Sequence, residues 1–294
     1  MMPSQIRFKK KPALAELWRE VKDEVGAPYI FDSTHAIRAS RITGFKNHND
    51  LVKIDTYEDL CDSMKEDDFF IVHRGGPSKK EQTHQFVRGA RRAYRTLDMP
   101  SEPLEEISHF YSPLDEIDQG EADSLSMVYN HRLIENFVYH TDTARMSIHL
   151  PGRTSSRIDN SFTYFVGTER IDVQSLQIEM DFIVEKNGDV VFAEAKRGPL
   201  WSNFGIAQVY LPYRKLLNIK NRVQGTFTIR PMFVMHYQAQ YEPTTRGFQA
   251  GRYDHIRLLE YRFLEPDRMD SIELVGAKEF VVLPRGGTGH VQRA

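Results

Sequence analysis

The stretch EMDFIVEKNGDVVFAEAK, residues 179–196, decides how this chain is expected to fold. It holds two apolar runs on either side of Asn187-Gly188. An Asn-Gly pair flanked in this way is the strongest short-range signal for a β-hairpin, because a type I′ turn needs positive φ at both central residues. With these two residues as the loop, Lys186 faces Asp189, and the pairing register of the whole hairpin follows from that pair.

This register gathers charged side chains on one face of the hairpin. Asp181 is expected opposite Glu194, and Glu179 opposite Lys196. Side chains alternate along a strand, so all four share a face. Facing residues have Cβ atoms about 4.5–5.5 Å apart, so the two carboxylates repel each other unless a cation lies between them. A divalent metal is the most economical cation, since Mg²⁺ is typically held by one or two carboxylates plus phosphate oxygens.

The opposite face of the same hairpin is uniformly apolar and is expected against a core. It carries Ile178, Met180, Phe182, Val184, Val191, Ala193 and Ala195. A plainer interpretation of the polar face is a surface hairpin with a cross-strand ion pair between Glu179 and Lys196. The combination of two facing acids, a tight turn and a fully apolar second face favours the metal site.

The acid, the hairpin and the triplet Glu194-Ala195-Lys196 together resemble the PD-(D/E)XK nuclease superfamily, the fold of most type II restriction endonucleases. The resemblance covers about Asp123 to Tyr237. It implies that Asp181 and Glu194 are metal-binding acids and that Lys196 is the catalytic lysine. The reaction implied is Mg²⁺-dependent hydrolysis of phosphodiester bonds in double-stranded DNA.

The resemblance also implies how the metal would be held and used. One or two Mg²⁺ ions would bind the two acids, with the backbone carbonyl of Ala195 as a further ligand. A bound metal lowers the pKa of its water, and Lys196 would orient that water or stabilise the pentacovalent phosphorus. One departure from the family pattern is Met180, which stands before the first acid where a proline is often found.

Three further residues are weaker candidates for the same site. Glu135 lies on a predicted helix from Ser124 to about His140, where the family often carries an acid that reaches the metal; a solvated glutamate is an equally good interpretation. Gln208 lies on the helix expected after the hairpin, near a glutamine common in the family; a buried glutamine satisfied by backbone is the alternative. Glu179 would tune the pKa of Lys196 or reach a second metal.

Charge is distributed unevenly, although the net charge is only −2. Residues 73–97 hold seven Lys or Arg against one acid, a local net charge of +6, and residues 98–124 hold nine acids and no Lys or Arg. A basic surface of this kind is expected on a protein that binds a polyanion; a solvated basic face is the alternative. The candidate DNA-binding residues are Arg74, Lys79, Lys80, Arg88, Arg91, Arg92 and Arg95.

The predicted fold class is α/β, with a mixed β-sheet flanked by helices in a restriction-endonuclease-like core and an N-terminal α+β DNA-binding region. We expect two domains: residues 1–120 for recognition and residues 121–294 for the nuclease core with C-terminal strands. Pro100–Gly120 is acidic and holds three prolines, which predicts a linker or surface loop. The other predicted elements are strands at Phe162–Val166, Thr226–Tyr237, Ile256–Phe263 and Ile272–Leu283, and a helix from Ser202 or Asn203 toward Leu217.

Composition excludes several other classes. The lone Cys61 excludes an intrachain disulfide, a cysteine zinc site and an iron–sulfur cluster. No apolar run approaches the ~18 residues of a membrane span, and the basic N-terminus lacks the apolar segment of a secretory signal, so a cytoplasmic protein is expected. A restriction enzyme with one centre per chain is expected to act as a homodimer on DNA. A resolvase or repair nuclease of the same fold, or a non-catalytic nucleic-acid-binding regulator, remains the alternative.

Overall fold

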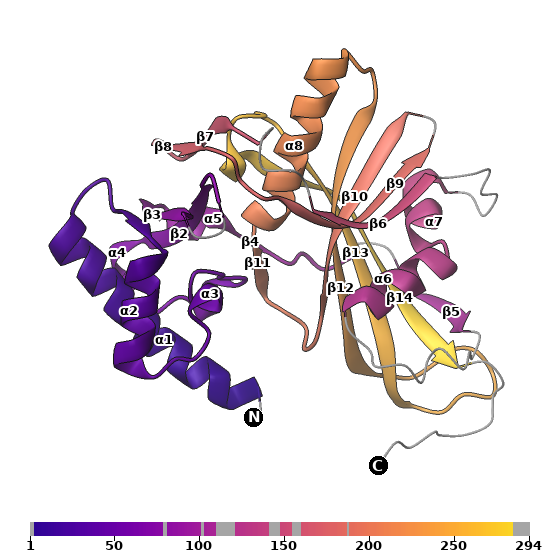
Figure 1. Cartoon of the computed structure of the whole chain (residues 1–294). Coiled ribbons are helices and arrows are strands. Elements are labelled where there is room, and N and C mark those ends of the chain that lie inside the picture. Colours follow the sequence, from indigo (N-terminus) through magenta and orange to yellow (C-terminus); the bar gives the residue numbers. More distant parts are fainter. Residues whose placement is uncertain are drawn as a thin grey trace.

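The computed structural model describes residues 3–78, 81–100, 103–109, 121–140, 148–154, 160–186 and 188–284, and the chain is mixed α/β (Figure 1). N-terminal helices and a small sheet lie on one side, a large twisted sheet lies on the other, and helix α8 (Ala207–Val223) stands between them. Among the described helices, none is long and apolar enough to cross a membrane.

The N-terminal region packs around one tryptophan. Trp18 comes from α1, and its ring lies 4.6 Å from that of Phe69 and 4.8 Å from that of Phe86. Both phenylalanines belong to a three-stranded sheet of order β1-β3-β2. The elements of this region are α1 (Pro3–Glu20), a π-helical turn (Val21–Val25), β1 (Ile30–Asp32), α2 (Ser33–Thr43), α3 (His48–Leu51), a 3₁₀ turn (Tyr57–Asp59), α4 (Asp62–Asp67), β2 (Phe69–Gly75) and β3 (Thr83–Arg88).

The large sheet has seven strands in the order β5-β14-β13-β12-β10-β9-β6. Most neighbours are antiparallel, but β10 pairs with β12 in parallel, and parallel neighbours need a crossover connection, which α8 provides. This arrangement agrees with the coarse prediction of a mixed sheet flanked by helices. The strands are β5 (Glu105–His109), β6 (Ile148–Thr154), β9 (Glu179–Lys186), β10 (Asp189–Arg197), β12 (Thr228–Tyr241), β13 (Gly251–Phe263) and β14 (Ile272–Pro284).

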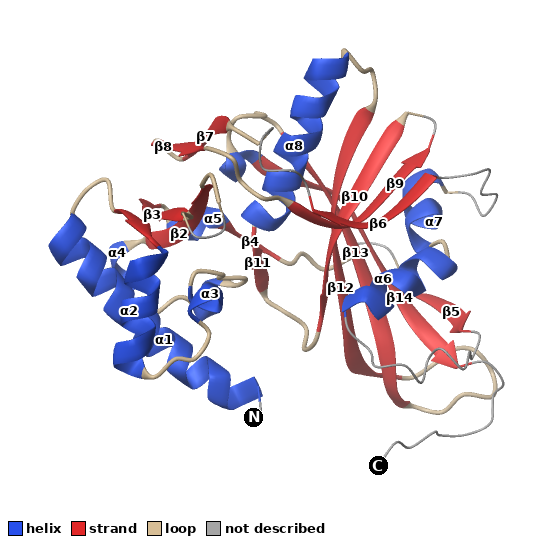
Figure 2. Cartoon of the chain, viewed as in Figure 1, coloured by secondary structure: helices blue, strands red, loops and turns tan. Residues whose placement is uncertain are grey.

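One face of this sheet is covered by two short helices, α6 (Glu121–Asn130) and α7 (Leu133–Tyr139) (Figure 2). The sequence predicted a single helix over this stretch, capped by Ser124. Instead the helix breaks at Arg132, which has a φ of 54°. Ser124 lies inside α6, fully buried, and its Oγ is 2.8 Å from His236 Nδ1, so it satisfies a buried histidine and caps no helix.

The opposite face of the sheet packs against α8 and the N-terminal region. A single cluster of buried apolar residues includes Trp18 and Phe86 from the N-terminal side and Phe204, Tyr210 and Phe233 from the α8 side. Because the two sides share one core, the geometry between them is fixed by packing. The two-domain division at residue 120 stays a prediction.

Two segments differ from the sequence-based expectation. Within the predicted linker, Glu105–His109 forms β5, an edge strand parallel to β14; backbone pairing at a sheet edge leaves no apolar alternation in the sequence to reveal it. Residues 110–120 lie outside the described part. The helix predicted from Ser202 or Asn203 begins only at Ala207, because Asn203–Gly205 forms β11 and pairs with β4 (Tyr94–Thr96).

The predicted strand at Phe162–Val166 exists as β7, but it pairs only with β8 (Glu169–Val173) in a two-stranded sheet. This hairpin connects distant parts of the chain. The backbone N–H of Gln174, just after β8, donates to the carbonyl of Arg74 at 2.8 Å, and the N–H of Phe165 donates to the carbonyl of Asp267 at 2.8 Å. It therefore bridges the small N-terminal sheet and the loop between β13 and β14.

Candidate active site

The β9–β10 hairpin has the register that the sequence predicts. Lys186 pairs with Asp189, and the ladder continues to Phe182 opposite Ala193. Asn187 lies outside the described residues; Gly188 has the positive φ, 85°, that the turn requires. The hairpin signal was reliable because a tight turn sets the register of every residue pair that follows it.

The backbone hydrogen bonds between β9 and β10 end at Ala193. Beyond that point, the side chain of Asp181 bonds to β10 instead. Oδ2 of Asp181 accepts a hydrogen bond from the backbone N–H of Ala195 at 3.0 Å. Asp181 is thereby held beside Glu194 by β10 itself. The two acids are neighbours on one face, as predicted, although they do not form a regular cross-strand pair.

Glu194 and Lys196 project from the same face of β10, and Lys196 donates a hydrogen bond to Glu194. Lys196 Nζ lies 2.7 Å from Glu194 Oε1, and the two side chains are only 13% and 15% exposed. Burial raises the pKa of Glu194 to about 8, and the charge of Asp181 adds to this effect against the opposing influence of Lys196. At neutral pH the metal-free site therefore keeps one of its two acids largely protonated.

The donor set suits a hard, oxygen-seeking cation. Burial beside Asp181 holds the carboxyl of Glu194 neutral, and a bound dication would favour the ionised form of both acids. A closed zinc site would need four protein ligands. Among the described residues, no group of three or more His, Cys, Asp or Glu side chains could hold a metal ion. Mg²⁺ commonly takes only one or two carboxylates and keeps several waters, so these residues fit Mg²⁺.

The weaker candidates are placed differently. Glu179 is exposed and pairs with Thr154 of β6, while its carboxylate accepts from Gln177 at 3.3 Å. The predicted pairing of Glu179 with Lys196 is not part of the β9–β10 ladder, which ends before it, and Lys196 instead donates to Glu194. Glu179 still lines the same cleft as Glu194.

Glu135 lies in the layer on the other side of the sheet. It is buried on α7, whose neighbours Ile134 and Phe137 pack with Phe182 and Ala193 on the face opposite Asp181 and Glu194. Its charge contributes to the raised pKa of Tyr139. Glu135 is thus separated by the sheet from the acids it was predicted to join.

Gln208, by contrast, lies at a cleft that reaches Glu194. The cleft has a volume of about 650 Å³ and lies between the N-terminal region and the hairpin. Gln208 Nε2 donates to Asp55 Oδ1 at 2.6 Å. The cleft is lined by Ser33, Ala36, His48, Asn49, Val52, Lys53, His73, Gln82, His84, Leu176, Gln177, Ile178, Glu179, Glu194, Ala207, Gln208, Leu211 and Pro212.

The histidines of the cleft were not singled out in the sequence, where they are dispersed. His73 and His84 face each other across β2 and β3, with ring centroids 4.4 Å apart. Burial lowers the pKa of His73 to about 4 and that of His84 to about 3. Both imidazoles are therefore neutral at physiological pH, and only the pairing of β2 with β3, which the sequence left ambiguous, could have revealed them together.

The predicted basic residues divide into two groups. Arg91, Arg92 and Arg95 line a pocket of about 350 Å³ together with Tyr94, Ile206, Asp270 and Ile272; we call this the arginine pocket. Arg74 and Arg88 have local roles: Arg74 Nε donates to the carbonyl of Asp172 at 3.0 Å, and the Arg88 guanidinium lies 5.4 Å from the Phe69 ring. Lys79 and Lys80 lie outside the described residues.

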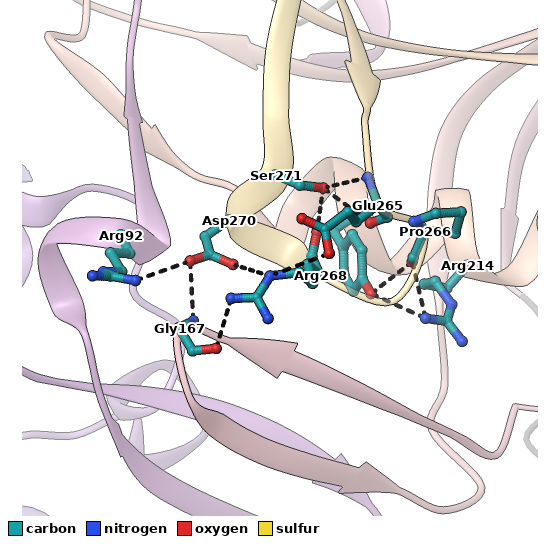
Figure 3. Close-up of polar contacts among 9 residues, drawn as sticks. Arg92, Gly167, Arg214, Glu265, Pro266, Arg268, Asp270 and Ser271 are labelled. Carbon is teal, nitrogen blue, oxygen red and sulfur yellow. Dashed lines mark hydrogen bonds and ion pairs between the residues drawn. The ribbon is translucent and has the colours of Figure 1, made fainter.

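One wall of the arginine pocket is held by a polar network (Figure 3). Asp270 accepts a hydrogen bond from the backbone N–H of Gly167 at 3.0 Å and lies 3.6 Å from Arg92. Arg268 Nη2 donates to the carbonyl of Gly167 at 2.8 Å. Arg214 of α8 donates to the carbonyl of Pro266 at 2.9 Å. The network ties the β7–β8 hairpin, the β13–β14 loop and α8 to the pocket, and no sequence pattern predicted it.

Comparison with protein families places most of this architecture in one domain. Residues 92–281 match the family described as "Domain of unknown function (DUF6997)", which is more than half of the 294-residue chain. The chain belongs to the DUF6997 family. No curated protein and no solved structure matches it.

The DUF6997 segment contains the acids and the lysine of the hairpin, α8 with Gln208, and two arginines of the arginine pocket, Arg92 and Arg95. The wall of the cleft that carries His73 and His84 comes from residues before the segment. The candidate site therefore combines the family domain with the N-terminal region of this chain.

Proposed function

We propose that the protein is a Mg²⁺-dependent endonuclease that hydrolyses phosphodiester bonds of double-stranded DNA, similar to type II restriction endonucleases of the PD-(D/E)XK superfamily. The observation that carries the proposal is the convergence of Asp181, Glu194 and Lys196 on one nearly enclosed face of the hairpin. Acidic groups buried together with a lysine are costly for folding alone, and a strongly perturbed carboxyl in a cleft is typical of a functional site.

The order of elements supports the same proposal. A helical pair is followed by the three antiparallel strands β6, β9 and β10, then by α8, and then by β12 parallel to β10. The resemblance implied a strand, hairpin, helix and strand, but the strand expected before the hairpin was Phe162–Val166, which lies outside this sheet as β7, and β6 takes that position instead. The acids lie on β9 and β10 in the middle of that unit, on the face that packs toward α8.

Each residue of the site has a role in this proposal. Asp181 and Glu194 would hold Mg²⁺, with the carbonyl of Ala195 as a further proposed ligand. Bound there, Mg²⁺ supplies Lewis-acid chemistry, which lowers the pKa of water and offsets charge on the phosphoryl oxygens. Lys196, fixed by its 2.7 Å contact with Glu194, places a compact ammonium where charge develops on the phosphate, a placement that enzymes use to stabilise transition states.

The arginine pocket supports DNA as the substrate. Three arginines on α5 (Ala90–Ala93) and β4 present guanidinium groups that match phosphate oxygens in geometry and charge. The pocket lies against Ile206, and the cleft lies against the next two residues of the chain, Ala207 and Gln208. A strand running past the start of α8 would meet phosphate-binding groups and acids in turn. Cleavage of both strands would involve a homodimer.

A plasmid cleavage assay tests this proposal. Purified protein with Mg²⁺ should convert supercoiled plasmid to nicked and linear forms, and chelation with EDTA should abolish the conversion. Asp181→Ala, Glu194→Ala and Lys196→Ala should each remove most of the activity. Glu185→Ala is the matched control, because Glu185 is an exposed carboxylate on the same strand as Asp181. A folded Glu194→Ala protein that cleaves at the normal rate would show that the assignment is wrong.

A further inference from the structure

Two residues that line the cleft each hold a buried polar atom without a hydrogen-bond partner in the described part of the chain. They are Nδ1 of His84 and Oε1 of Gln208. His84 is only 4% exposed, and Gln208 is held through its other amide atom, Nε2, by Asp55. Buried polar groups in folded proteins are nearly always paired, so these two atoms point to a partner that enters the cleft.

The residues that line the cleft indicate the chemistry of the ligand that would fit it. Its polar groups are mostly uncharged: the amides Asn49, Gln82, Gln177 and Gln208, and the neutral imidazoles of His73 and His84. Apolar side chains such as Val52, Leu176 and Leu211 lie between them. Neutral hydrogen-bonding groups among apolar surfaces suit a planar, uncharged, polar ligand, and the carboxylate of Glu179 in the same lining disfavours an anion.

The arginine pocket has the complementary chemistry. It offers three guanidinium groups, whereas the cleft offers no arginine and a single lysine, Lys53. The two recesses flank the junction of β11 and α8, since Ile206 lines one and Ala207 lines the other. A nucleic-acid strand carries both chemistries close together, because each nucleotide joins a charged phosphate to a neutral base.

We propose that the cleft binds an unpaired nucleobase of the DNA strand that the acids of the hairpin act on, with Gln208 and His84 hydrogen-bonding to the edge of the base. This inference rests on the proposed function for its choice of DNA as the ligand. A volume of about 650 Å³ lies in the range of small-molecule sites. A base within a duplex must leave the stack to enter such a pocket, so the strand presents its base either flipped out or already single.

A binding experiment without metal tests the inference directly. Single-stranded DNA carrying one 2-aminopurine, whose fluorescence reports stacking, is titrated with the metal-free protein and compared with the same strand in a blunt duplex. We expect a fluorescence change with the single strand. In a second series of strands, each base in turn is replaced by an abasic residue. We expect binding to be at least tenfold weaker when the replaced base is the one that enters the cleft. Equal binding of strands with an abasic residue at every position in turn would overturn the inference.

Two substitutions assign the contacts. Gln208→Met keeps the length of the side chain and removes the amide; Gln238→Met is the matched control, because Gln238 also donates to a carboxylate, Asp254 at 3.2 Å, but lies on β12 outside the cleft. We expect the first to weaken single-strand binding about tenfold and to flatten the preference among the four bases, and the second to change neither. Identical binding by both variants would count against the inference.

A second variant guards against a misfolded protein. His84→Phe keeps a ring where His84 stacks on Phe31, with centroids 5.4 Å apart, and removes Nδ1. It should melt cooperatively and still lose base preference; unchanged preference in the folded variant contradicts the role given to His84. The two proposals fail separately: cleavage without any base-dependent binding would refute the cleft inference alone, and base-dependent binding without metal-dependent cleavage would refute the nuclease alone.

Discussion

The proposed role of Lys196 depends on the compact shape of its ammonium group, so replacing it by a guanidinium should reduce activity. Lys196 Nζ sits 2.7 Å from Glu194 Oε1 with the side chain almost enclosed. An arginine carries the same charge on a wide planar fork and is not equivalent at such a position. We expect Lys196→Arg to lower the rate of plasmid cleavage by about 10²–10³-fold, comparable to the loss of one stabilising donor in other enzymes. The measurement is the single-turnover rate with saturating Mg²⁺, and a rate within a factor of about three of that of the native protein would contradict the role proposed for the ammonium.

For single residues, the sequence predicted the cross-strand pairs whose register the turn sets, and it missed the contacts that lie beyond the end of that ladder. The tight turn fixed the register as far as Ala193, and it placed Asp181 beside Glu194. It could not foresee that the carboxylate of Asp181 would take the N–H of Ala195, which ends the ladder. Glu135 was assigned by family analogy, which carries no information about the layer that a residue joins, and α7 places it across the sheet. Glu179 was assigned by extending the ladder beyond Ala193, where it ends.

The histidine pair of the cleft should give stability a pH dependence. The pKa of His84 falls from an ordinary 6.5 to about 3 through burial, with His73 adding to the effect. The unfolded chain then takes up a proton near pH 6.5, while the folded chain does not until about pH 3. Stability is therefore full above pH 6.5 and is lost as the pH falls from 6.5 toward 3, by up to about 1.4 kcal/mol per pH unit for this group.

The variant His84→Phe isolates this contribution. The free energy of unfolding is measured by urea titration at pH 8 and pH 5 for both proteins. The packing change shifts both values of the variant equally, so the pH 8 to pH 5 difference reports the proton alone. We expect the native protein to lose about 1–2 kcal/mol more than the variant over this range. Equal losses would show that His84 takes up its proton equally in the folded and unfolded states.

At the scale of strands, breaking a buried ion pair between β13 and β14 should destabilise the protein strongly. Glu279 accepts hydrogen bonds from Tyr237 at 2.6 Å, His255 at 2.8 Å and Arg257 at 2.9 Å. Arg257 is only 2% exposed, so Glu279→Leu leaves a buried guanidinium without its counter-charge. We expect a loss of about 3–5 kcal/mol in the free energy of unfolding.

The same two strands offer a matched control for that substitution. Glu273 of β14 pairs with Arg262 of β13, but these side chains are 47% and 62% exposed. Glu273→Leu should cost less than about 1 kcal/mol, as exposed ion pairs usually do. Urea denaturation of both variants decides the matter, and similar losses for the two would mean that burial does not govern these pairs.

The elements themselves were predicted unevenly, for reasons that follow from their environment. Central strands such as β12 and β13 have long apolar stretches, and their existence was predicted near the observed bounds. The edge strand β5 and the three-residue strand β11 were missed, because pairing through a few backbone hydrogen bonds leaves little trace in side-chain pattern. The division of one predicted helix into α6 and α7 depends on a positive φ at Arg132. A positive φ is not expected of an arginine from the sequence.

Across the whole molecule, the arginine pocket should dominate the salt dependence of DNA binding. Arg91 and Arg92 are exposed on α5, and replacing both with Gln removes up to two phosphate contacts. We expect the log–log slope of affinity against salt to flatten by roughly 0.9 for each lost contact. Arg41→Gln, on an exposed face of α2, is the control and should leave the slope unchanged. An unaltered slope in the double variant would favour a solvated basic face.

The overall assembly of the site could not be predicted from the sequence. The cleft joins His73 and His84 to Glu194 and Gln208, residues more than a hundred positions apart, through a core shared by the two sides of the molecule. Local patterns report on turns and strands, whereas this juxtaposition depends on how α1, α8 and the small sheet pack together. Charge was informative in a different way: the basic stretch led to the arginine pocket, but not to the split between Arg74, which supports the fold, and Arg91, which faces solvent.

The number of catalytic centres per chain sets the expected assembly on DNA. The sequence holds one acid–hairpin–Glu-x-Lys set, and one such centre cuts one strand at a time. Breaking both strands in a single binding event therefore needs two chains, and a two-fold homodimer on a palindromic site is the simplest arrangement because protein and site then share symmetry. We expect light scattering of Glu194→Gln, which should bind without cutting, to give two chains per duplex on any DNA that the native protein is found to linearise. A one-to-one complex, together with linear plasmid that appears without a nicked intermediate, would show instead that a single chain cuts both strands.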